Sequence, residues 1–593
     1  MAGQPKTPFY VVLAMVVVAL IAFSVYRWSD VIAPRGNANK GATIDPKQIA
    51  QNAAGKPAQA PQPGKVEAMD TAGLPATTVK EYTFKPAERL PEIKGTSAYA
   101  PMKDNTVRFA LNVWAGWGPI ILANDGFKPG KVWRTPDGKE FRVELVLIDD
   151  PSAMINAYAT GQVHIGWGTL DMVPLFVDSM VDRTGKPKDS RVMPRIFQQI
   201  DWSNGGDGIV VREDIKTVAD LRDRDLVLAQ NSPSQYFALN MLVAGGVQPS
   251  EVRMTYTNSA FEAAAAFNAK KDIAGAVSWS PDIYNLAKAK GNRMLVNTQT
   301  ANKLIADVWF ARADFAKDHP GIIEGLVRGI FDAMEEMKKP EQKAACSKLM
   351  ADGYTIPADD AMAMFGDAHN TNWAENFQFF LNQNNPTNFE RVWRQSYYLY
   401  RQIGTIQNPA VRFDQVMDFS IIQKLGNEEK YSSQRDEYQT QFAAKTVGEI
   451  RAESPEILTN TVVIHFYPND WNLNKKVTKD VNGKTVEEPY DPNVDNVLEG
   501  VAKLIGQFGA ARVVIEGHTD SSQKGQVPVD LVKELSMNRA NAVKEALVQK
   551  YNIEPNRLLV DGLGWDRPAD LANPLDQAKN RRVEIKVYPA EKQ

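Results

Sequence analysis

The sequence predicts a transmembrane helix, then an α/β domain of two lobes, then a smaller α+β sandwich domain. Three observations carry this prediction. An uncharged apolar run lies near the N-terminus, short apolar runs alternate with amphipathic helical patterns from Thr106 to Leu425, and a second, shorter series of strands and helices ends the chain. At 593 residues the chain is too long for a single hydrophobic core, which also indicates several domains.

The N-terminal run "FYVVLAMVVVALIAFSVYRW" covers residues 9–28 and carries no acidic residue. About 20 apolar residues span the roughly 30 Å of a bilayer's hydrocarbon. We therefore expect an uncleaved inner-membrane helix with residues 1–8 in the cytoplasm. The alternative is a cleaved signal peptide ending at "VIA", but Pro34 follows that motif and the run is long for such a peptide.

Residues 29–105 are rich in Ala, Pro, Gly, Lys and Gln, as in "GKPAQAPQPGKVEAMDTAGLPATTVK". This composition does not bury enough apolar surface to fold, and it indicates a tether. We expect short elements such as Val79–Phe84 to dock onto the next domain.

Residues 106–425 contain the alternating pattern. "TVRFALNVW" precedes "GPIILANDG", and "DLVLAQ" precedes "NSPSQYFALNMLVAGG". The pattern predicts βαβ units and mostly parallel sheets in two lobes. A polar helical connector is expected over 426–455, and residues 456–593 form the last domain.

Polar residues and tryptophans recur where these strands pass into helices. Pro, Ser and Thr suit the first turn of a helix, and several helix N-termini at the carboxyl ends of strands form an anion site without a cationic side chain. Capping or core packing would explain any one of them alone. The candidate solute-binding residues are Trp114, Ser152, Thr169, Ser232, Ser234, Ser278 and Trp279.

Asp520 and Arg539 stand at either end of a polar loop near the C-terminus, in "GHTDSSQKGQVPVDLVKELSMNRANAV". Together they could hold a zwitterion, because the acid suits an ammonium group and the arginine suits a carboxylate in bidentate fashion. Diaminopimelate in the stems of bacterial peptidoglycan offers such a group. The alternative is an ordinary surface salt bridge between the two.

"IEGHTDS", "LSMNRANAV", "GLGWDRP" and "NRRVEI" together resemble the peptidoglycan-binding domain of the OmpA family. The resemblance implies that Asp520 and Arg539 bind diaminopimelate, with Thr519 and Arg582 as further contacts and His518 in a structural role. The sequence departs from the family in a longer loop and in Val532, where the family has an asparagine. That loss would weaken binding or shift it onto Asp530.

The middle domain resembles ABC-transporter substrate-binding proteins of the nitrate/sulfonate/bicarbonate type. The resemblance rests on "INAYATGQVHIGWG", on "IKTVADLRDRDLVLAQNSPSQYFALNMLVAGGVQPSEV" and on "FARADFAKDHPGIIEGLV". It implies a periplasmic-binding-protein-like fold whose two lobes close on a small solute. It does not name the solute.

Composition excludes several other functions. Lys+Arg total 68 against 71 Asp+Glu, so no basic field for nucleic acid is expected. The one cysteine, Cys346, excludes an intrachain disulfide, and the 5 histidines show no metal-ligand spacing. No nucleophile or phosphate-loop motif is present, so we expect neither enzyme activity nor a metal or cofactor.

These features predict an inner-membrane-anchored periplasmic protein that binds a small anionic solute and attaches to peptidoglycan. A membrane permease or an envelope complex is the expected partner. The alternative is a structural envelope scaffold, in which the middle domain is a spacer or docking module without a ligand.

Overall fold

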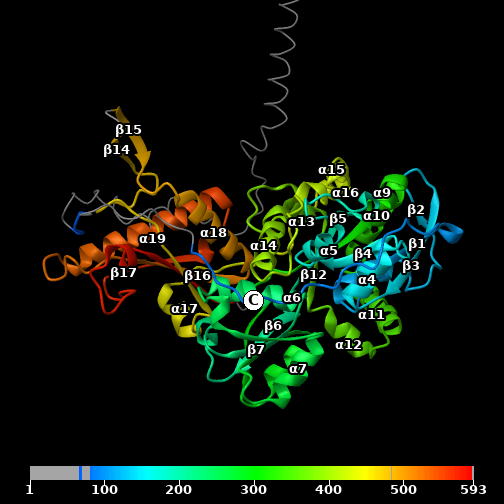
Figure 1. Cartoon of the computed structure of the whole chain (residues 1–593), viewed down its shortest axis with the longest axis horizontal. Coiled ribbons are helices and arrows are strands. Elements are labelled where there is room, and N and C mark those ends of the chain that lie inside the picture. The colour runs from blue at the N-terminus through cyan, green and yellow to red at the C-terminus, as the bar shows by residue number, and fades with distance from the viewer. Residues whose placement is uncertain (1–65, 70–79, 482–483, 591–593) are drawn as a thin grey trace, which may run out of the picture. The chain divides into compact units, whose positions relative to one another are not determined.

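The computed structural model describes residues 66–69, 80–481 and 484–590 (Figure 1). The predicted cytoplasmic segment 1–8, the predicted membrane helix 9–28 and much of the predicted tether lie outside these ranges. Across the ranges that the structure does describe, no helix is both long enough and apolar enough to cross a membrane.

The first lobe of the middle domain is built on a seven-stranded sheet in the order β12-β5-β11-β4-β1-β3-β2. Its strands are β1 (Thr106–Leu111), β2 (Trp133–Arg134), β3 (Glu140–Leu147), β4 (Ile165–Thr169), β5 (Pro194–Ser203), β11 (Ala306–Arg312) and β12 (Ala368–Asn370). Its helices include α3 (Gly118–Ala123), α4 (Pro151–Ala159), α5 (Val173–Met180), α9 (Ala313–Asp318), α10 (Pro320–Glu336), α11 (Pro340–Tyr354) and α12 (Ala358–Met364).

The second lobe has a five-stranded sheet in the order β10-β6-β9-β7-β8. The strands are β6 (Asp207–Arg212), β7 (Asp225–Ala229), β8 (Arg253–Thr257), β9 (Gly275–Trp279) and β10 (Asn292–Asn297). The helices that pack on them are α6 (Pro233–Ala244), α7 (Ala260–Ala269) and α8 (Asp282–Lys288). The two lobes confirm the predicted α/β architecture.

The prediction of mostly parallel sheets was wrong. Among the described strands of the two lobes, only the pairs β1–β3, β1–β4, β7–β8 and β7–β9 are parallel, whereas β5, β6, β10 and β11 pair antiparallel. The physical reason is that the chain passes between the sheets twice, from β5 to β6 and from β10 to β11. The chain leaves the first sheet along β5 and returns to it along β11, so these two neighbours run in opposite directions, and the same holds for β6 and β10 in the second sheet.

The two crossings are tied together at Thr298, whose hydroxyl accepts hydrogen bonds from the backbone N–H of Gly205 (2.8 Å) and of Asp207 (3.1 Å). The Ser203 hydroxyl donates to Asp207 Oδ2 at 2.7 Å. Gly205 has a φ of +96°, which favours glycine and permits the sharp exit from β5. The crossings therefore form one buried polar hinge.

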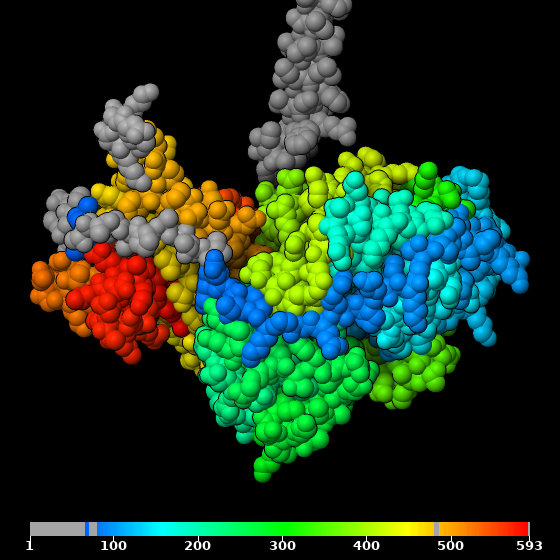
Figure 2. Space-filling view, viewed as in Figure 1, coloured from blue at the N-terminus to red at the C-terminus, as the bar shows by residue number. Residues whose placement is uncertain are grey.

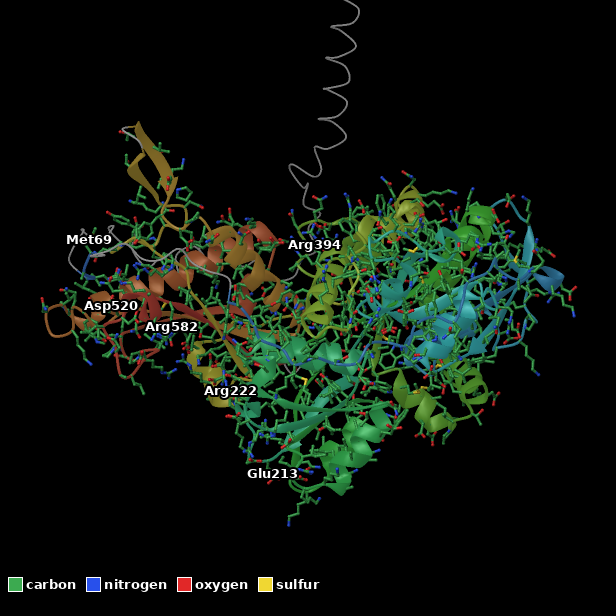
Figure 3. The ribbon with its side chains drawn as sticks, viewed as in Figure 1. Met69, Glu213, Arg222, Arg394, Asp520 and Arg582 are labelled. Atoms are coloured by element: carbon green, nitrogen blue, oxygen red, sulfur yellow. The ribbon has the colours of Figure 1, made fainter. Side chains whose placement is uncertain are left out.

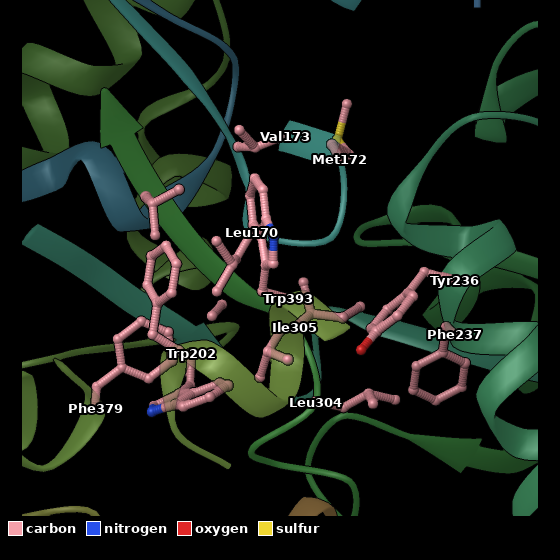
Figure 4. Packing of buried hydrophobic residues seen from close by; sticks show 14 of the residues in the cluster. Leu170, Met172, Val173, Trp202, Tyr236, Phe237, Leu304, Ile305, Phe379 and Trp393 are labelled. Carbon is pink, nitrogen blue, oxygen red and sulfur yellow. The ribbon is translucent and has the colours of Figure 1, made fainter. Parts of the chain in front are cut away.

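Apolar side chains from both lobes meet beside this hinge. Figure 4 shows Leu170 and Met172 from the first lobe, Tyr236 and Phe237 from α6 of the second, and Trp393 from α14 (Phe389–Gln402). All five are buried. The lobes are thus packed against one another in this structure.

Helices after β12 complete the first lobe: α13 (Trp373–Leu381), α14 (Phe389–Gln402), α15 (Ser420–Leu425) and α16 (Glu429–Ser432). The expected helical connector is mostly extended, with only α16 and the short α17 (Val447–Glu453) in helical form. Tyr438 explains the extended path, because its ring stacks on His369 at 4.0 Å and its hydroxyl donates to Asn204 Oδ1 at 2.9 Å.

The described part of the tether from Lys80 onward runs as an extended chain over the second lobe (Figure 2, blue over green). The Tyr82 hydroxyl donates to Val243 O at 2.9 Å, and Thr83 N donates to Gln248 Oε1 at 2.7 Å. Ala87 N donates to Ile403 O at 2.9 Å. The docking expected for this stretch is therefore present.

The C-terminal domain has a four-stranded sheet in the order β13-β18-β16-β17, with β16 and β17 parallel. The strands are β13 (Leu458–Val462), β16 (Ala511–His518), β17 (Leu558–Gly564) and β18 (Val583–Ala590), and the main helices are α18 (Val494–Gln507) and α19 (Val529–Tyr551). This confirms the predicted α+β arrangement. A hairpin of β14 (Lys476–Val481) and β15 (Lys484–Pro489) was not predicted.

Two glycines set the distance between α19 and this sheet. A Cβ on Gly517 of β16 would lie 2.0 Å from Ser536 O, and one on Gly562 of β17 would lie 2.3 Å from Lys533 O. Both separations are far below contact distance, so the helix approaches this closely only where the strands lack side chains. The close approach holds Arg539 of α19 to the strand end that Asp520 follows.

Candidate functional site

The predicted acid and base of the C-terminal domain come from different elements. Asp520 lies two residues after β16, and Arg539 lies in the middle of α19. The backbone N–H of Ser522 donates to Asp520 Oδ1 at 2.7 Å and fixes the carboxylate in its turn. Both side chains are buried, with residue exposures of 3% and 1%.

The two residues do not pair with each other, so the alternative of a simple salt bridge between them was wrong. Asp520 Oδ2 accepts from Arg581 Nε at 2.6 Å. Arg539 Nη1 and Nη2 donate to Glu67 Oε1 and Oε2, each at 2.6 Å. Arg581 Nε also lies 3.5 Å from Glu67 Oε1, so acid and base alternate along a buried row.

Contacts within the protein hold the side chain of Arg539 in position. Its Nε donates to Asp470 O at 3.1 Å, and its guanidinium lies 5.0 Å from the centre of the Phe466 ring. Its two terminal nitrogens both face the carboxylate of Glu67. This geometry suits bidentate recognition of a carboxylate.

Of the two further contacts implied by the resemblance, Thr519 stays a prediction, and Arg582 has other partners in this structure. Thr519 is buried, and its hydroxyl has no hydrogen-bond partner among the described residues. Arg582 instead donates to Glu584 Oε1 at 2.8 Å and to Arg567 O at 3.0 Å. Successive residues of an extended chain point to opposite sides, so it is Arg581 that reaches Asp520.

The residues at the departures from the family pattern also have definite places. Val532 packs in a small apolar cluster with Leu535 and Trp565. Asp530 is exposed in the first turn of α19, and no hydrogen bond or ion pair of the described residues joins it to Asp520 or Arg539.

Glu516, His518 and Glu584 bring three potential metal-ligand atoms within 4.8 Å of one another. Arginines already balance both carboxylates, with Arg451 Nη2 2.6 Å from Glu516 Oε1 and Arg582 Nη2 2.6 Å from Glu584 Oε1. Burial lowers the pKa of His518 to about 4, so its ring is neutral at pH 7. The cluster is a buried ion-pair network that leaves no uncompensated charge for a cation, in keeping with a structural His518.

Three of the predicted solute-binding residues lie near the place where the two lobes pack against each other. Thr169 ends β4, Ser232 precedes α6 and Ser234 lies in the first turn of α6, and all three are buried. The Ser232 hydroxyl donates to Ala229 O at 2.8 Å. The hydroxyls of Thr169 and Ser234 have no hydrogen-bond partner in the described part of the chain.

The other four have local roles. Trp114 donates from Nε1 to Asp201 Oδ2 at 3.2 Å, beside the hinge. Ser152 is half-buried in α4, where Asp150 is the N-cap and accepts from Ala153 N at 2.6 Å. The Ser278 hydroxyl donates to Ala260 O at 3.3 Å, and the Trp279 ring lies 6.1 Å from that of Phe261. These last two contacts place Ser278 and Trp279 beside the start of α7, and their role in solute binding stays a prediction.

Four buried aspartates near the hinge were missed. They are Asp171, Asp201, Asp207 and Asp307. Burial raises the pKa of Asp171 and of Asp207 to about 7. Asp201 and Asp307 lie opposite each other on β5 and β11, and burial together with their proximity raises the pKa of Asp307 well above its usual range. None of the four forms an ion pair with a lysine or arginine among the described residues, and their hydrogen bonds include those from the side chains of Trp114, Ser203 and Tyr400.

Like Asp201, Asp171 has one carboxylate oxygen without a hydrogen-bond partner among the described residues. Its Oδ2 accepts from the Tyr400 hydroxyl at 3.3 Å, whereas Oδ1 has no partner in the described chain. Thr169 is close enough to lower the pKa of Asp171 somewhat, but its hydroxyl makes no hydrogen bond of standard geometry. Tyr400 of α14 also reaches Ser232 O at 3.5 Å, so it joins the two lobes.

Further polar atoms without partners gather at the start of α6. Buried oxygen or nitrogen atoms that lack a hydrogen bond within the described ranges occur in Thr169, Asp171, Asn231, Ser234, Gln235 and Tyr236. Buried polar groups are normally satisfied, so such a group of atoms indicates a place for water or a ligand. The signal in the sequence was the pairing of "GWGTLD" with "NSPSQY" at two strand ends.

A surface cavity of about 870 Å³ lies elsewhere on the first lobe, between α9, α10 and α15. Charged residues of both signs line it, including Arg191, Arg195, Asp314 and Glu324. None of the predicted solute-binding residues is among its walls, so it is not the predicted cleft.

Two parts of the chain match known protein families. Residues 487–582 match the OmpA family, and residues 203–344 match the family described as NMT1/THI5 like. The outer membrane protein Omp38 of Acinetobacter baumannii is 37% identical over 115 residues, which are 19% of this chain and 30% of that protein. The taurine-binding periplasmic protein of Escherichia coli is 25% identical over 212 residues, which are 34% of this chain and 62% of that protein.

Among solved structures, the periplasmic aliphatic sulphonate binding protein SsuA from Escherichia coli aligns with a TM-score of 0.41 and 16% identity, covering 53% of this chain and 98% of that one. The chain spans less than two thirds of both Omp38 and the taurine-binding protein. It therefore contains an OmpA-family domain and an NMT1/THI5-like substrate-binding domain, which confirms both resemblances at the level of the domain.

The buried aspartates predict a specific pH dependence of stability. Their pKa is raised in the folded protein and is about 4 in the unfolded chain, so the folded state binds more protons between these values and is destabilised as pH rises from about 4 to about 7. Asp307→Asn removes one such group and keeps its shape. We expect the melting temperature of the variant, relative to the wild type, to rise steadily between pH 5 and pH 8 in thermal denaturation.

Asp272→Asn is the matched control, because Asp272 is exposed in a turn of the same domain. Its melting temperature should differ from that of the wild type by the same amount at every pH. A difference for Asp307→Asn that does not change with pH would contradict the assignment of a raised pKa.

Proposed function

We propose that the protein is a periplasmic solute-binding protein held at peptidoglycan through its C-terminal domain, and that it binds without catalysis. The observation that carries the peptidoglycan half is the bidentate contact of the buried Arg539 with a carboxylate, that of Glu67, at 2.6 Å to each oxygen. The OmpA-family match over residues 487–582 supports it independently.

In this proposal the diaminopimelate carboxylate takes the position opposite Arg539, and its ammonium group takes Asp520. Both side chains are already oriented, Arg539 by Asp470 O and Phe466 and Asp520 by Ser522 N. Side chains that are oriented in advance lower the entropic cost of binding. Thr519, with its unpartnered hydroxyl, is a further contact.

Asp520→Ala and Arg539→Ala should each reduce binding of the full-length protein to purified peptidoglycan sacculi by about 30-fold or more. Removing one partner of a buried charge pair costs about 2–5 kcal/mol. Co-sedimentation over a range of sacculus concentrations measures the change. Arg539→Lys keeps the charge but loses the planar fork, and it should lie between the wild type and Arg539→Ala.

Arg394→Ala is the control, since Arg394 is an exposed arginine of α14 paired only with Glu390 among the described residues (Figure 3). It should sediment as the wild type does. Undiminished pelleting of both Asp520→Ala and Arg539→Ala would refute peptidoglycan binding at this site.

For the solute, we propose a small molecule with a positively charged nitrogen, in place of the anion expected from the helix N-termini. Asp171 offers an unpartnered carboxylate oxygen beside Thr169 and the start of α6, and no lysine or arginine of the described chain pairs with it. In its ionised form this carboxylate attracts a cation, and pairing with one offsets the burial that raises the pKa of Asp171. The taurine-binding relative is named for a zwitterion that carries an ammonium group.

Thermal shift of the full-length protein tests the solute class. Glycine betaine, ethanolamine and taurine each carry a positive nitrogen, and ethanesulfonate is the matched anion without one. We expect at least one of the first three to raise the melting temperature by several degrees at about 100 times its Kd, and ethanesulfonate to have no effect. Asp171→Asn should abolish the shift, whereas Asp272→Asn should preserve it.

A shift with ethanesulfonate alone would contradict the proposed charge. No shift with any small molecule would favour the second candidate function, a structural scaffold. Tyr400 supports that candidate, because its hydroxyl contacts Asp171 and Ser232 O and joins the lobes with a side chain of the protein itself.

We also propose that residues 9–28 anchor the protein in the inner membrane and so present the binding domain to a permease. The support is the apolar composition of this stretch, in which residues 9–23 carry no charge. After lysozyme digestion of the sacculus, the full-length protein should stay in the membrane pellet in alkaline carbonate. A version exported by a cleavable signal in place of residues 1–28 should be soluble. Release of the full-length protein by carbonate would contradict the anchor.

A further inference from the structure

We propose that Val66–Met69 is an internal ligand of the peptidoglycan site, and that Glu67 closes this site against the peptidoglycan stem until the segment leaves. The inference rests on the proposed function of Asp520 and Arg539. It adds that the free protein exists with this site occupied by its own tether.

The carboxylate of Glu67 takes up both terminal nitrogens of Arg539. Both of its oxygens accept from the guanidinium at 2.6 Å, and the residue is 1% exposed. A second arginine, Arg581, lies 3.5 Å from Glu67 Oε1. A diaminopimelate carboxylate would need the same two nitrogens of Arg539, so it and Glu67 exclude each other.

The backbone of the segment is recognised as well as its side chain. Asn469 Oδ1 accepts from the N–H of Val66 and of Glu67, both at 2.8 Å, and Asn469 Nδ2 donates to Glu67 O at 3.1 Å. Arg581 Nη2 donates to Ala68 O at 2.8 Å. Figure 3 places Met69, the exposed end of the segment, on the same domain as Asp520.

An apolar contact completes the fit. Val66 is 5% exposed and packs with Val532, Leu535 and Trp565. Val532 is the position at which the sequence departs from the OmpA-family pattern by carrying an apolar side chain. An asparagine there would leave a polar group against Val66, so this departure suits the tether segment.

Side chains of the protein itself thereby pair with both of the charged residues that a bound zwitterion would pair with. Glu67 takes the position of the carboxylate on Arg539, and the guanidinium of Arg581 takes the position of the ammonium on Asp520. An occupant on the same chain competes at an effective concentration that reaches the millimolar range for short linkers. Apparent affinity for peptidoglycan is then reduced by the fraction of molecules whose site is closed.

Sacculus binding by the full-length protein tests the inference. Glu67→Gln keeps the shape of the side chain but removes its charge, and we expect it to bind sacculi at least about fivefold more tightly than the wild type. Glu81→Gln, a change at an exposed glutamate of the same tether, should bind as the wild type does. Equal or weaker binding by Glu67→Gln, with the wild type binding, would overturn the internal ligand and leave peptidoglycan binding intact.

Absence of binding by both the wild type and Glu67→Gln would overturn peptidoglycan binding itself, and the inference with it. Hydrogen exchange gives a second measurement on the unaltered protein. The amides of Val66 and Glu67 should be protected, because both donate to Asn469, and should lose protection when a soluble diaminopimelate-containing muropeptide is added. Protection that persists with the muropeptide bound at saturation would overturn the inference.

Discussion

Burying an ionised side chain without a partner costs several kcal/mol, so each buried charge must be paired or neutralised. The two candidate sites of this protein meet that constraint in opposite ways. In the C-terminal domain, Arg539 and Asp520 are paired with Glu67 and Arg581. Near the hinge, the aspartates lack such partners and their pKa rises with burial, which favours the protonated acid. A ligand of the C-terminal site therefore has to replace existing ion pairs. A ligand near the hinge instead meets aspartates that have no ion-pair partner among the described residues.

The hinge links this electrostatic arrangement to the fold. Two direct crossings join the sheets, Thr298 ties them together, and Asp207 belongs to the same network. Tyr400 and Tyr438 bring later parts of the chain to this region, at Asp171 and Asn204 respectively. A change in the relative position of the lobes would therefore alter the contacts of segments that follow the second lobe in the sequence.

Local patterns predicted most of the elements and both domains. The alternation of strands and helices was sufficient for the two lobes, and ordered motifs were sufficient to place Asp520 after a strand and Arg539 on a helix. Strand direction was mispredicted, because a run of apolar residues has the same period in parallel and antiparallel pairs. The contacts of Ser278 with Ala260 and of Arg582 with Glu584 were not predicted for a related reason, since a local motif does not specify which neighbour a side chain meets.

By itself the sequence determined the order of the domains, the periodic elements and the residue types available for chemistry. Only the tertiary structure decided which charges meet. Glu67 and Arg539 are 472 positions apart, and the four buried aspartates come from separate strand ends and loops of both lobes. Contacts over such separations depend on how closely helices pack on sheets. Gly517 and Gly562, for example, allow α19 to approach its sheet. That packing involves the whole chain, so no local pattern records it.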